Sequence, residues 1–296
     1  MRVIFLGCGY LGHNLSRLME GRFEISVLSI PSPYTDRTDH YREVNVFDPE
    51  QLKQVDLEDA VVVDSTGLVP NNATSNDEDA MLQDLLEKYR NLLKVLKEGG
   101  ASRFVYISSG GTIYGSGNRA FEETDEIHPV SLYARSKAMT EQLIRDFGMD
   151  YLIVRLANPF GGYQEPNKRQ GVIPILVRKA LLGEVFEMWT DGSSIRDYIY
   201  ITDAAEAMAL LIEKGISNTI VNIGSGIGTS LKDVISEVEV NTGRKIRMEY
   251  QKFEVPVVES TLLNIDKLKQ LTGFEPEVSF HEGVRLEVER VKEEIA

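Results

Sequence analysis

Short, mostly apolar runs alternate with longer stretches of helical periodicity through the first half of this 296-residue chain. Five such runs occupy residues 3–6, 25–28, 60–63, 104–107 and 151–154. Their length and composition are typical of strands buried on both faces of a parallel sheet. Because helical segments separate them, the pattern indicates β-α-β units and predicts an α/β fold with a doubly wound parallel sheet.

The longest helical pattern covers residues 76–98, where apolar residues such as Met81, Leu85 and Leu92 recur at helical spacing. Gly99 and Gly100 follow, and glycine tolerates the left-handed conformation at a helix end. This apolar stripe is broader than packing on one sheet face requires. The main interpretation is a helix packed on its own sheet, and a dimer interface is the additional hypothesis.

The sequence changes to glycine, proline and charged residues at about residue 160. We therefore expect a larger first domain over residues 1–160, with return segments near 195–225, and a smaller C-terminal α/β lobe over residues 161–296. A charged helix is expected from about Glu282. We identify no internal repeat and no low-complexity segment.

Composition and charge exclude several classes of protein. The chain is 42% hydrophobic and 26% charged, which is ordinary for a globular protein. Its 46 acidic and 32 basic residues give a formal net charge of −14, which disfavours nucleic acid and anionic membranes as partners. Cys8 is the single cysteine, and we see neither a signal peptide nor an apolar run of membrane-spanning length, so we expect a cytoplasmic protein. The four scattered histidines show no metal-ligand spacing, so no metal is expected.

A glycine-rich loop follows the first predicted strand. Gly7, Gly9 and Gly12 fit the G-x-G-x-x-G pattern, with Tyr10 and Leu11 between the last two, and a helical run follows. Glycines there permit a tight turn, close approach to a pyrophosphate and close packing of helix on strand. In this context the motif predicts that residues 1–160 form a dinucleotide-binding Rossmann domain, which leaves residues 161–296 as the substrate lobe.

The acidic residue that commonly holds the adenosine ribose of NAD is missing after the second strand. The strand ends at Leu28-Ser29-Ile30, and the first acid beyond it is Asp36, followed by Arg37. NAD is the expected cofactor and NADP is the alternative; Arg37 is the candidate partner for the extra phosphate of NADP, and surface solvation is the ordinary role of such a residue.

Tyr133 and Lys137 are four residues apart and therefore share one face of a helix. An ammonium group near a phenol favours the phenolate, which gives a base that can work near neutral pH. A solvent-exposed pair on a helix is the alternative explanation of the spacing alone.

The order of the motifs distinguishes these interpretations. The glycine loop, the stretch Ser108-Ser109-Gly110-Gly111-Thr112-Ile113-Tyr114-Gly115 and the Tyr133/Lys137 pair follow one another as in the extended short-chain dehydrogenase/reductase family. The chain resembles the nucleotide-sugar epimerases and dehydratases of that family nearly from end to end. Further matching stretches begin at Arg155, Gln170, Asp191 and Val221.

The resemblance implies roles for individual residues. It makes Tyr133 the acid/base and Lys137 the residue that tunes it and binds the nicotinamide ribose. Asn158, Arg169 and Arg196 are implied on the substrate side, where a guanidinium suits a diphosphate. Cofactor contacts are expected from Gly7, Gly9, Tyr10, Leu11, Gly12, Asn45, Val46, Ser65, Thr66, Gly67, Ser108, Tyr133, Lys137 and Pro159.

Some positions depart from the family pattern. Gly110 stands where relatives commonly have the serine or threonine of the catalytic triad, so Thr112 and Ser109 are the candidates for that hydroxyl. Gly111 and Thr112 occupy the positions of the acidic pair of the dehydratases. The third main strand ends in Asp64, for which a strand-end cap is the expected role.

The expected function is 4-epimerisation of a nucleotide-diphosphate sugar of the UDP-hexose type, through transient oxidation to a keto sugar. An NADPH-dependent nucleotide-sugar ketoreductase is the alternative, supported by the absent acid after the second strand. A non-catalytic NAD(P)-binding regulator is the alternative from another class. The resemblance also implies a homodimer, formed through helices near residues 76–98 and 131–147.

Overall fold

Seven parallel strands form the central sheet of the computed structural model, which describes residues 1–70, 73–165, 171–251 and 259–295. The spatial order is β10-β6-β5-β4-β1-β2-β3. The strands are β1 (Arg2–Leu6), β2 (Glu24–Ser29), β3 (Tyr41–Glu43), β4 (Val61–Asp64), β5 (Arg103–Ser109), β6 (Tyr151–Leu156) and β10 (Thr219–Ile223). All five strands expected from the sequence are confirmed, and the doubly wound α/β class with them.

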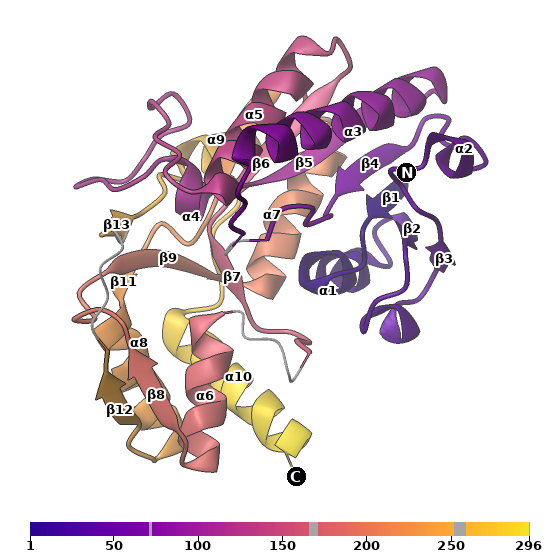
Figure 1. Ribbon diagram of the computed structural model, residues 1–296. Coiled ribbons are helices and arrows are strands. Elements are labelled where there is room, and N and C mark those ends of the chain that lie inside the picture. The colour runs from indigo at the N-terminus through magenta and orange to yellow at the C-terminus, as the bar shows by residue number, and fades with distance from the viewer. Residues whose placement is uncertain (71–72, 166–170, 252–258, 296) are drawn as a thin grey trace.

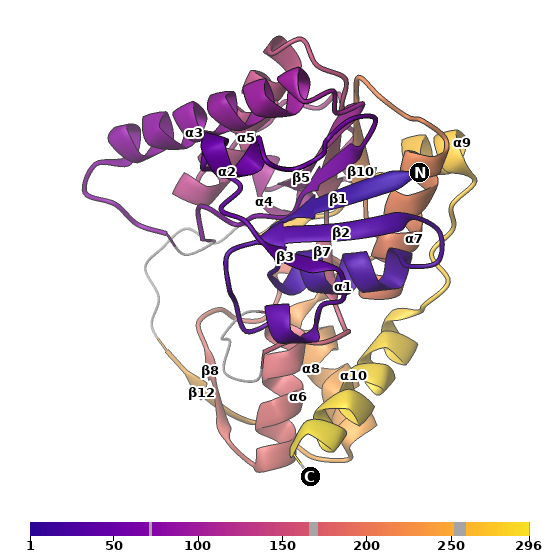
Figure 2. The ribbon, with the colours of Figure 1, turned by 90° about the vertical axis from the view of Figure 1, so that its right-hand side faces the viewer.

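Helices cover both faces of this sheet (Figures 1 and 2). Helices α3 (Glu78–Glu98) and α5 (Leu132–Asp146) pack side by side on one face, and α1 (Tyr10–Met19) and α7 (Ile201–Glu213) pack together on the other. The side chains of Asp77 and Ser131 cap α3 and α5 by accepting a hydrogen bond from a backbone N–H of the first turn. Gly100, at φ 79°, follows α3 in the left-handed conformation that the sequence predicted.

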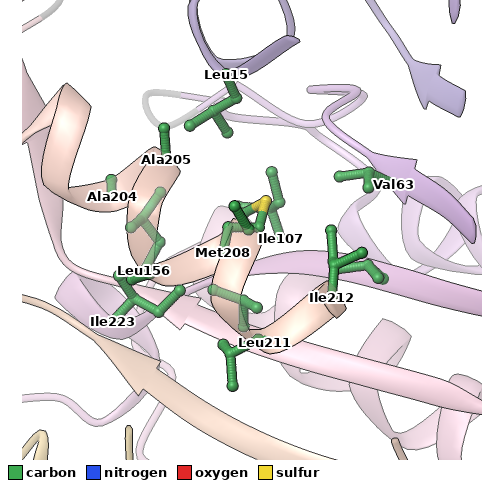
Figure 3. Packing of buried hydrophobic residues seen from close by; sticks show 14 of the residues in the cluster. Leu15, Val63, Ile107, Leu156, Ala204, Ala205, Met208, Leu211, Ile212 and Ile223 are labelled. Atoms are coloured by element: carbon green, nitrogen blue, oxygen red, sulfur yellow. The ribbon is translucent and has the colours of Figure 1, made fainter. Parts of the chain in front are cut away.

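The core between the sheet and α7 joins distant parts of the chain. Figure 3 shows Met208 and Ile212 of α7 packed with Ile107 of β5 and Val63 of β4. The sequence from 201 to 223 therefore returns to the sheet, where β10 pairs in parallel with β6. Helix α9 (Asp266–Thr272) packs against α7 and β10.

The remaining elements form a second layer below the carboxyl edge of the sheet (Figure 1). Helices α6 (Val172–Leu182), α8 (Leu231–Thr242) and α10 (Phe280–Ile295) pack around a separate apolar core. Strand β9 (Ile195–Tyr200) pairs with β7 (Asn158–Phe160), β11 (Gly228–Ser230) and β13 (Ser260–Thr261). Strands β8 (Val185–Met188) and β12 (Arg247–Tyr250) form a parallel pair.

Three short helical turns complete the described structure. They are η1 (Thr35–Arg37), α2 (Pro49–Leu52) and α4 (Gly110–Ile113). Helix α4 begins directly after β5 and packs against α5, so the end of a central strand, a short turn and the helix of Tyr133 meet at one place.

Candidate active site

The carboxyl ends of the parallel strands bring most of the expected site residues to one edge of the sheet. Leu6 at the end of β1 lies opposite Asp64 of β4, and Asp64 lies opposite Tyr106 of β5. The glycine loop, the segment 65–67 and the Ser108-Ser109 pair follow these positions directly. Parallel α/β sheets bind ligands in the crevice at this edge.

The glycine loop has the shape that a pyrophosphate needs. Gly7 has φ 90°, and a Cβ atom there would lie 2.9 Å from the Cα of Thr66. A Cβ on Gly12 would lie 2.1 Å from the Gly7 oxygen and 2.6 Å from the Ser65 Oγ, so glycine is required for the close packing of α1. In the described structure a Cβ on Gly9 would meet nothing within 4 Å, so the helix N-terminus is open on that side. The residues present therefore fit a dinucleotide phosphate.

Two serines of the expected cofactor set have different environments. The Ser65 hydroxyl hydrogen-bonds with the carbonyl oxygens of Leu6 and Gly7, each at 2.9 Å, and so holds the loop. The Ser108 hydroxyl is buried and has no hydrogen-bond partner among the described residues. A buried hydroxyl without a partner is costly, so Ser108 fits a position that a bound ligand completes.

The other expected cofactor residues line different parts of this region. Tyr10 donates its hydroxyl to the Gly161 carbonyl at 2.9 Å, and Leu11 packs against the core beneath α1. Val46 is buried, whereas Asn45 is exposed and its side-chain oxygen accepts a hydrogen bond from the Phe47 N–H. Pro159 lies in β7, opposite Ile199 of β9.

The segment after β2 is held by aromatic contacts. The Arg37 guanidinium lies 4.6 Å from the centre of the Tyr163 ring, so it stacks on an aromatic face in addition to facing solvent. His13 contacts the rings of Tyr34 and Tyr163 and lies 2.7 Å from the Thr38 hydroxyl. Burial, followed by the charges of nearby arginines, lowers the pKa of His13 to about 4, so this side chain is neutral near pH 7.

Tyr133 and Lys137 lie in α5, as their spacing predicts. The Lys137 Nζ is buried and donates a hydrogen bond to the Ile107 carbonyl at 2.8 Å, which fixes α5 to the end of β5. It lies 5.8 Å from the centre of the Tyr133 ring. Burial alone lowers the pKa of Lys137, but the phenols of Tyr106 and Tyr133 and the Asp64 carboxylate outweigh it and raise this pKa above its ordinary value. Lys137 is therefore a fixed cation beside the Tyr133 phenol.

The structure explains the glycine at the triad position. A Cβ on Gly110 would lie 2.6 Å from Cδ1 of Leu263 and 2.9 Å from the Arg155 carbonyl oxygen, so a serine there would require these neighbours to shift. Ser109 and Thr112, the two candidates for the missing hydroxyl, lie at the start of α4. Thr112 donates its hydroxyl to the Ser109 Oγ at 2.9 Å, which leaves the Ser109 proton available to another acceptor.

Of the residues expected on the substrate side, Asn158 and Arg196 lie on the neighbouring strands β7 and β9. The Asn158 amide donates to the Asp197 carbonyl at 2.8 Å, and a Cβ on Gly111 would lie 3.2 Å from its side-chain oxygen. Arg196 donates to the Ile195 carbonyl at 2.7 Å, and burial lowers the pKa of its guanidinium. Arg169, the third expected substrate residue, lies outside the described residues.

Three residues in or near this site were not among the site residues expected from the sequence. Asp64 accepts hydrogen bonds from the backbone and hydroxyl of Thr66, which is the expected cap, and also from the Tyr89 hydroxyl of α3. Tyr106 lies between Asp64 and Lys137. The sequence marks Asp64 as unusual because it is an acidic residue at the end of an apolar strand. Tyr89 and Tyr106 occupy positions where core residues recur, so nothing in the sequence distinguishes them from ordinary core tyrosines.

Comparison with known proteins assigns the chain. Residues 5–224 match the family described as NAD dependent epimerase/dehydratase. The chain belongs to this family. Its members are enzymes of the extended short-chain dehydrogenase/reductase class, which confirms the resemblance, the enzyme class and the NAD cofactor expected from the sequence.

Relatives of this chain in the NAD-dependent epimerase/dehydratase family differ in activity. The dTDP-4-dehydro-6-deoxyglucose reductase of Escherichia coli is 30% identical over 226 residues, which cover 74% of this chain and 71% of that protein. The UDP-glucose 4-epimerase of Thermus thermophilus, solved with NAD, is 26% identical with a TM-score of 0.87 over 99% of both chains. The UDP-glucose 4-epimerase of Thermotoga maritima, solved with UDP-glucose, is 27% identical with a TM-score of 0.83 over 100% of both.

Two kinds of feature are absent from the described part of this family member. Among the described residues, none of the helices combines the length and apolarity that crossing a membrane requires. The same part of the chain contains no group of three or more histidine, cysteine or acidic side chains placed to hold a metal ion.

Proposed function

We propose that this chain is an NAD-dependent 4-epimerase of UDP-linked hexoses. The observation that carries the proposal is the pairing of Tyr133 with a buried, charged Lys137 at the carboxyl edge of the sheet, the edge that also carries the glycine loop. The chain-long likeness to two solved UDP-glucose 4-epimerases supports the choice of reaction and substrate.

The two parts of the chain divide the binding. Residues 1–160, with the returning segment near 195–225, hold NAD through the glycine loop, Ser108 and Lys137. Residues 161–296 hold the sugar nucleotide, and Arg196 pairs with its diphosphate while Asn158 lies where β7 meets the cofactor domain. Binding energy from the diphosphate holds the sugar while the reacting carbon changes.

The proton transfers belong to Tyr133. As a phenolate stabilised by the Lys137 charge, it removes the proton of the C4 hydroxyl, and the C4–O bond becomes a carbonyl as the C4–H bond breaks. Bound NAD supplies the acceptor, and later the donor, of the hydrogen and electron pair at C4. The Ser109 hydroxyl, with its own acceptor filled by Thr112, donates a hydrogen bond to the sugar oxygen.

Inversion requires the keto sugar to turn in the site before it is reduced. Reduction from the other face of the carbonyl restores the hydroxyl with the opposite configuration, and Tyr133 returns the proton. No net oxidation results. The acidic pair of the dehydratases is replaced by Gly111 and Thr112, and the close approach of Asn158 to Gly111 leaves little space for a longer side chain there.

A nucleotide-sugar ketoreductase is the second candidate. The similarity to the Escherichia coli reductase favours it, as does the absence of an acid at the end of β2, where the chain has Ser29. In that reaction the keto sugar is the substrate, NADPH is consumed, and Tyr133 donates rather than removes the first proton.

The proposal includes a homodimer formed through α3 and α5. These helices lie side by side on one face of the sheet, and Met81, Met139 and Leu143 on them are partly exposed apolar residues. Light scattering coupled to size exclusion tests this part. A mass of one chain at micromolar concentration would contradict it.

The reaction is tested by NMR on purified protein with UDP-glucose, UDP-galactose and their N-acetyl forms, with NAD or NADPH added in turn. The proposal predicts the 4-epimer with no net change in cofactor. Tyr133→Phe is expected to reduce turnover by roughly 10²- to 10⁴-fold while NAD still binds. Tyr250→Phe, which changes an exposed tyrosine, is the matched control. A 4-keto nucleotide sugar with NADPH is assayed in parallel, and its reduction without epimerisation of the other sugars would instead identify the reductase.

A further inference from the structure

Asp64 is a buried carboxylate close to the Tyr133/Lys137 pair. Asp64 is the last residue of β4 and is 1% exposed. It accepts hydrogen bonds from the Thr66 N–H at 2.9 Å, the Thr66 hydroxyl at 2.6 Å and the Tyr89 hydroxyl at 2.7 Å. Three donors therefore hold this one carboxylate in place.

Tyr106 connects this carboxylate to Lys137. It is the register partner of Asp64 on β5, so the two residues are neighbours on adjacent strands. Lys137 lies on the same helix as Tyr133, and its Nζ is 4.6 Å from the centre of the Tyr106 ring. Tyr89 packs edge-on against Tyr106, with ring centres 5.8 Å apart. Tyr89, Tyr106 and Lys137 also line one small pocket.

Neither charge of this group has a conventional partner. Within the described residues, neither Asp64 nor Lys137 forms a close ion pair, and both side chains are buried. Burial of a charge without an opposite charge nearby is costly, so the two charges need each other. Groups facing Lys137 are Tyr106 from β5, Asp64 from β4 and Tyr133 from its own helix.

The other buried charges nearby are already matched. Glu141, one turn further along α5, binds Arg155 of β6 at 2.8 Å. Of the described carboxylates that act on Lys137, Asp64 is therefore the one without a cation of its own.

We propose that Asp64 is the counter-charge of Lys137, held at a fixed separation by Tyr89 and Tyr106, and that it sets the pH at which Tyr133 becomes a base. It is a positioning residue, because it acts through Lys137. The inference rests on the roles proposed above for Tyr133 and Lys137. The negative charge of Asp64 favours the protonated ammonium of Lys137. It also offsets part of the positive field that Lys137 exerts on the Tyr133 hydroxyl, so removal of this negative charge makes the phenolate of Tyr133 easier to form.

The central test is the variant Asp64→Asn, compared with the wild type over pH 5 to 9. Asparagine retains an oxygen for the two Thr66 donors, and its NH₂ group can donate to the Tyr89 oxygen. The removal of the negative charge is expected to move the acid midpoint of kcat/KM to lower pH by about one unit. An unchanged midpoint, or a shift to higher pH, would overturn the proposal.

Asp191 offers a matched control. Its carboxylate accepts from the N–H and hydroxyl of Ser193 at 2.9 and 2.6 Å, the same local arrangement as Asp64 with Thr66, but it is exposed. Asp191→Asn is expected to leave the midpoint in place. If it shifts the midpoint as Asp64→Asn does, loss of the local turn and not of the buried charge explains the effect, and the proposal fails.

Two measures keep the inference separate from the proposed function. Asp64→Ser removes the same charge with a smaller side chain, and is used if Asp64→Asn does not fold. The ionisation midpoint of Tyr133 is also followed without any sugar, as the absorbance difference near 295 nm between each protein and its Tyr133→Phe partner. An ionisation midpoint of Tyr133 that is the same in the Asp64 variants and the wild type refutes the inference. Full activity of Tyr133→Phe refutes the proposed function.

Discussion

A Cβ atom on Gly110 would lie 2.6 Å from Cδ1 of Leu263, which joins the turn after β5 to the segment after β13. Gly110→Ser is therefore expected to lower the free energy of unfolding by about 1–3 kcal/mol through overpacking. Urea unfolding followed by circular dichroism measures this. Gly67→Ser is the control for stability, because nothing described lies within 4 Å of its added Cβ. Equal stability of Gly110→Ser and the wild type would contradict the explanation of this glycine.

The missing triad hydroxyl leads to a second prediction. Thr112 donates to Ser109, so Ser109 is the hydroxyl with a free proton. Ser109→Ala is expected to reduce kcat by about 10²-fold, and Thr112→Val by less, because Thr112 acts by orienting Ser109. Steady-state kinetics on the substrate identified by NMR compare the two. A larger loss in Thr112→Val would assign the role to Thr112 instead.

Arg196 provides a prediction about substrate binding. If its guanidinium binds the diphosphate, Arg196→Gln loses a charge-assisted contact and kcat/KM falls roughly 10- to 100-fold, mainly through KM. Arg196→Lys is expected to recover part of this loss, since it restores the charge but not the planar fork. NAD affinity, measured by calorimetry, stays unchanged, as do the kinetics of the exposed control Arg285→Gln. A parallel loss of NAD affinity would show that Arg196 supports the cofactor site and would contradict its role in binding the substrate diphosphate.

His13 predicts how stability depends on pH. Because its folded-state pKa of about 4 lies below the ordinary 6.5, the unfolded chain takes up this proton first as the pH falls. The contribution of neutral His13 is complete above about pH 6.5 and is lost as the pH falls towards about 4. Thermal unfolding of the wild type is thus expected to be steeper in pH across this window than that of His13→Asn. The exposed control His128→Asn is expected to follow the wild type, and equal slopes for His13→Asn would contradict the assignment.

Much of the fold could be predicted from the sequence because its signals are local. Runs such as Val3 to Leu6 are buried on both faces, and their apolar composition predicts strands without long-range information. Strand β3 gave no such signal, since its three residues Tyr41–Glu43 form the edge of the sheet and are largely exposed.

The site was predictable to the extent that its residues form motifs. Gly7, Gly9 and Gly12 occur together because one tight turn and one close helix–strand contact require them. Tyr133 and Lys137 share one helix face because they are four residues apart. The group of Asp64, Tyr89 and Tyr106 could not be predicted, because it joins β4, α3 and β5 through contacts that depend on sheet order and register. The same holds for Gly110, whose constraint comes from Leu263, 153 residues further along the chain.

The central claim is reversible oxidation at C4 of a UDP-hexose, and NMR of the reaction in D₂O tests it most directly. With NAD and UDP-galactose, the account predicts that UDP-glucose appears with protium, not deuterium, at C4, because the hydrogen that leaves the carbon returns to it. Tyr133→Phe should slow the appearance of this signal by roughly 10²- to 10⁴-fold. Deuterium at C4, or no formation of UDP-glucose, would contradict the account.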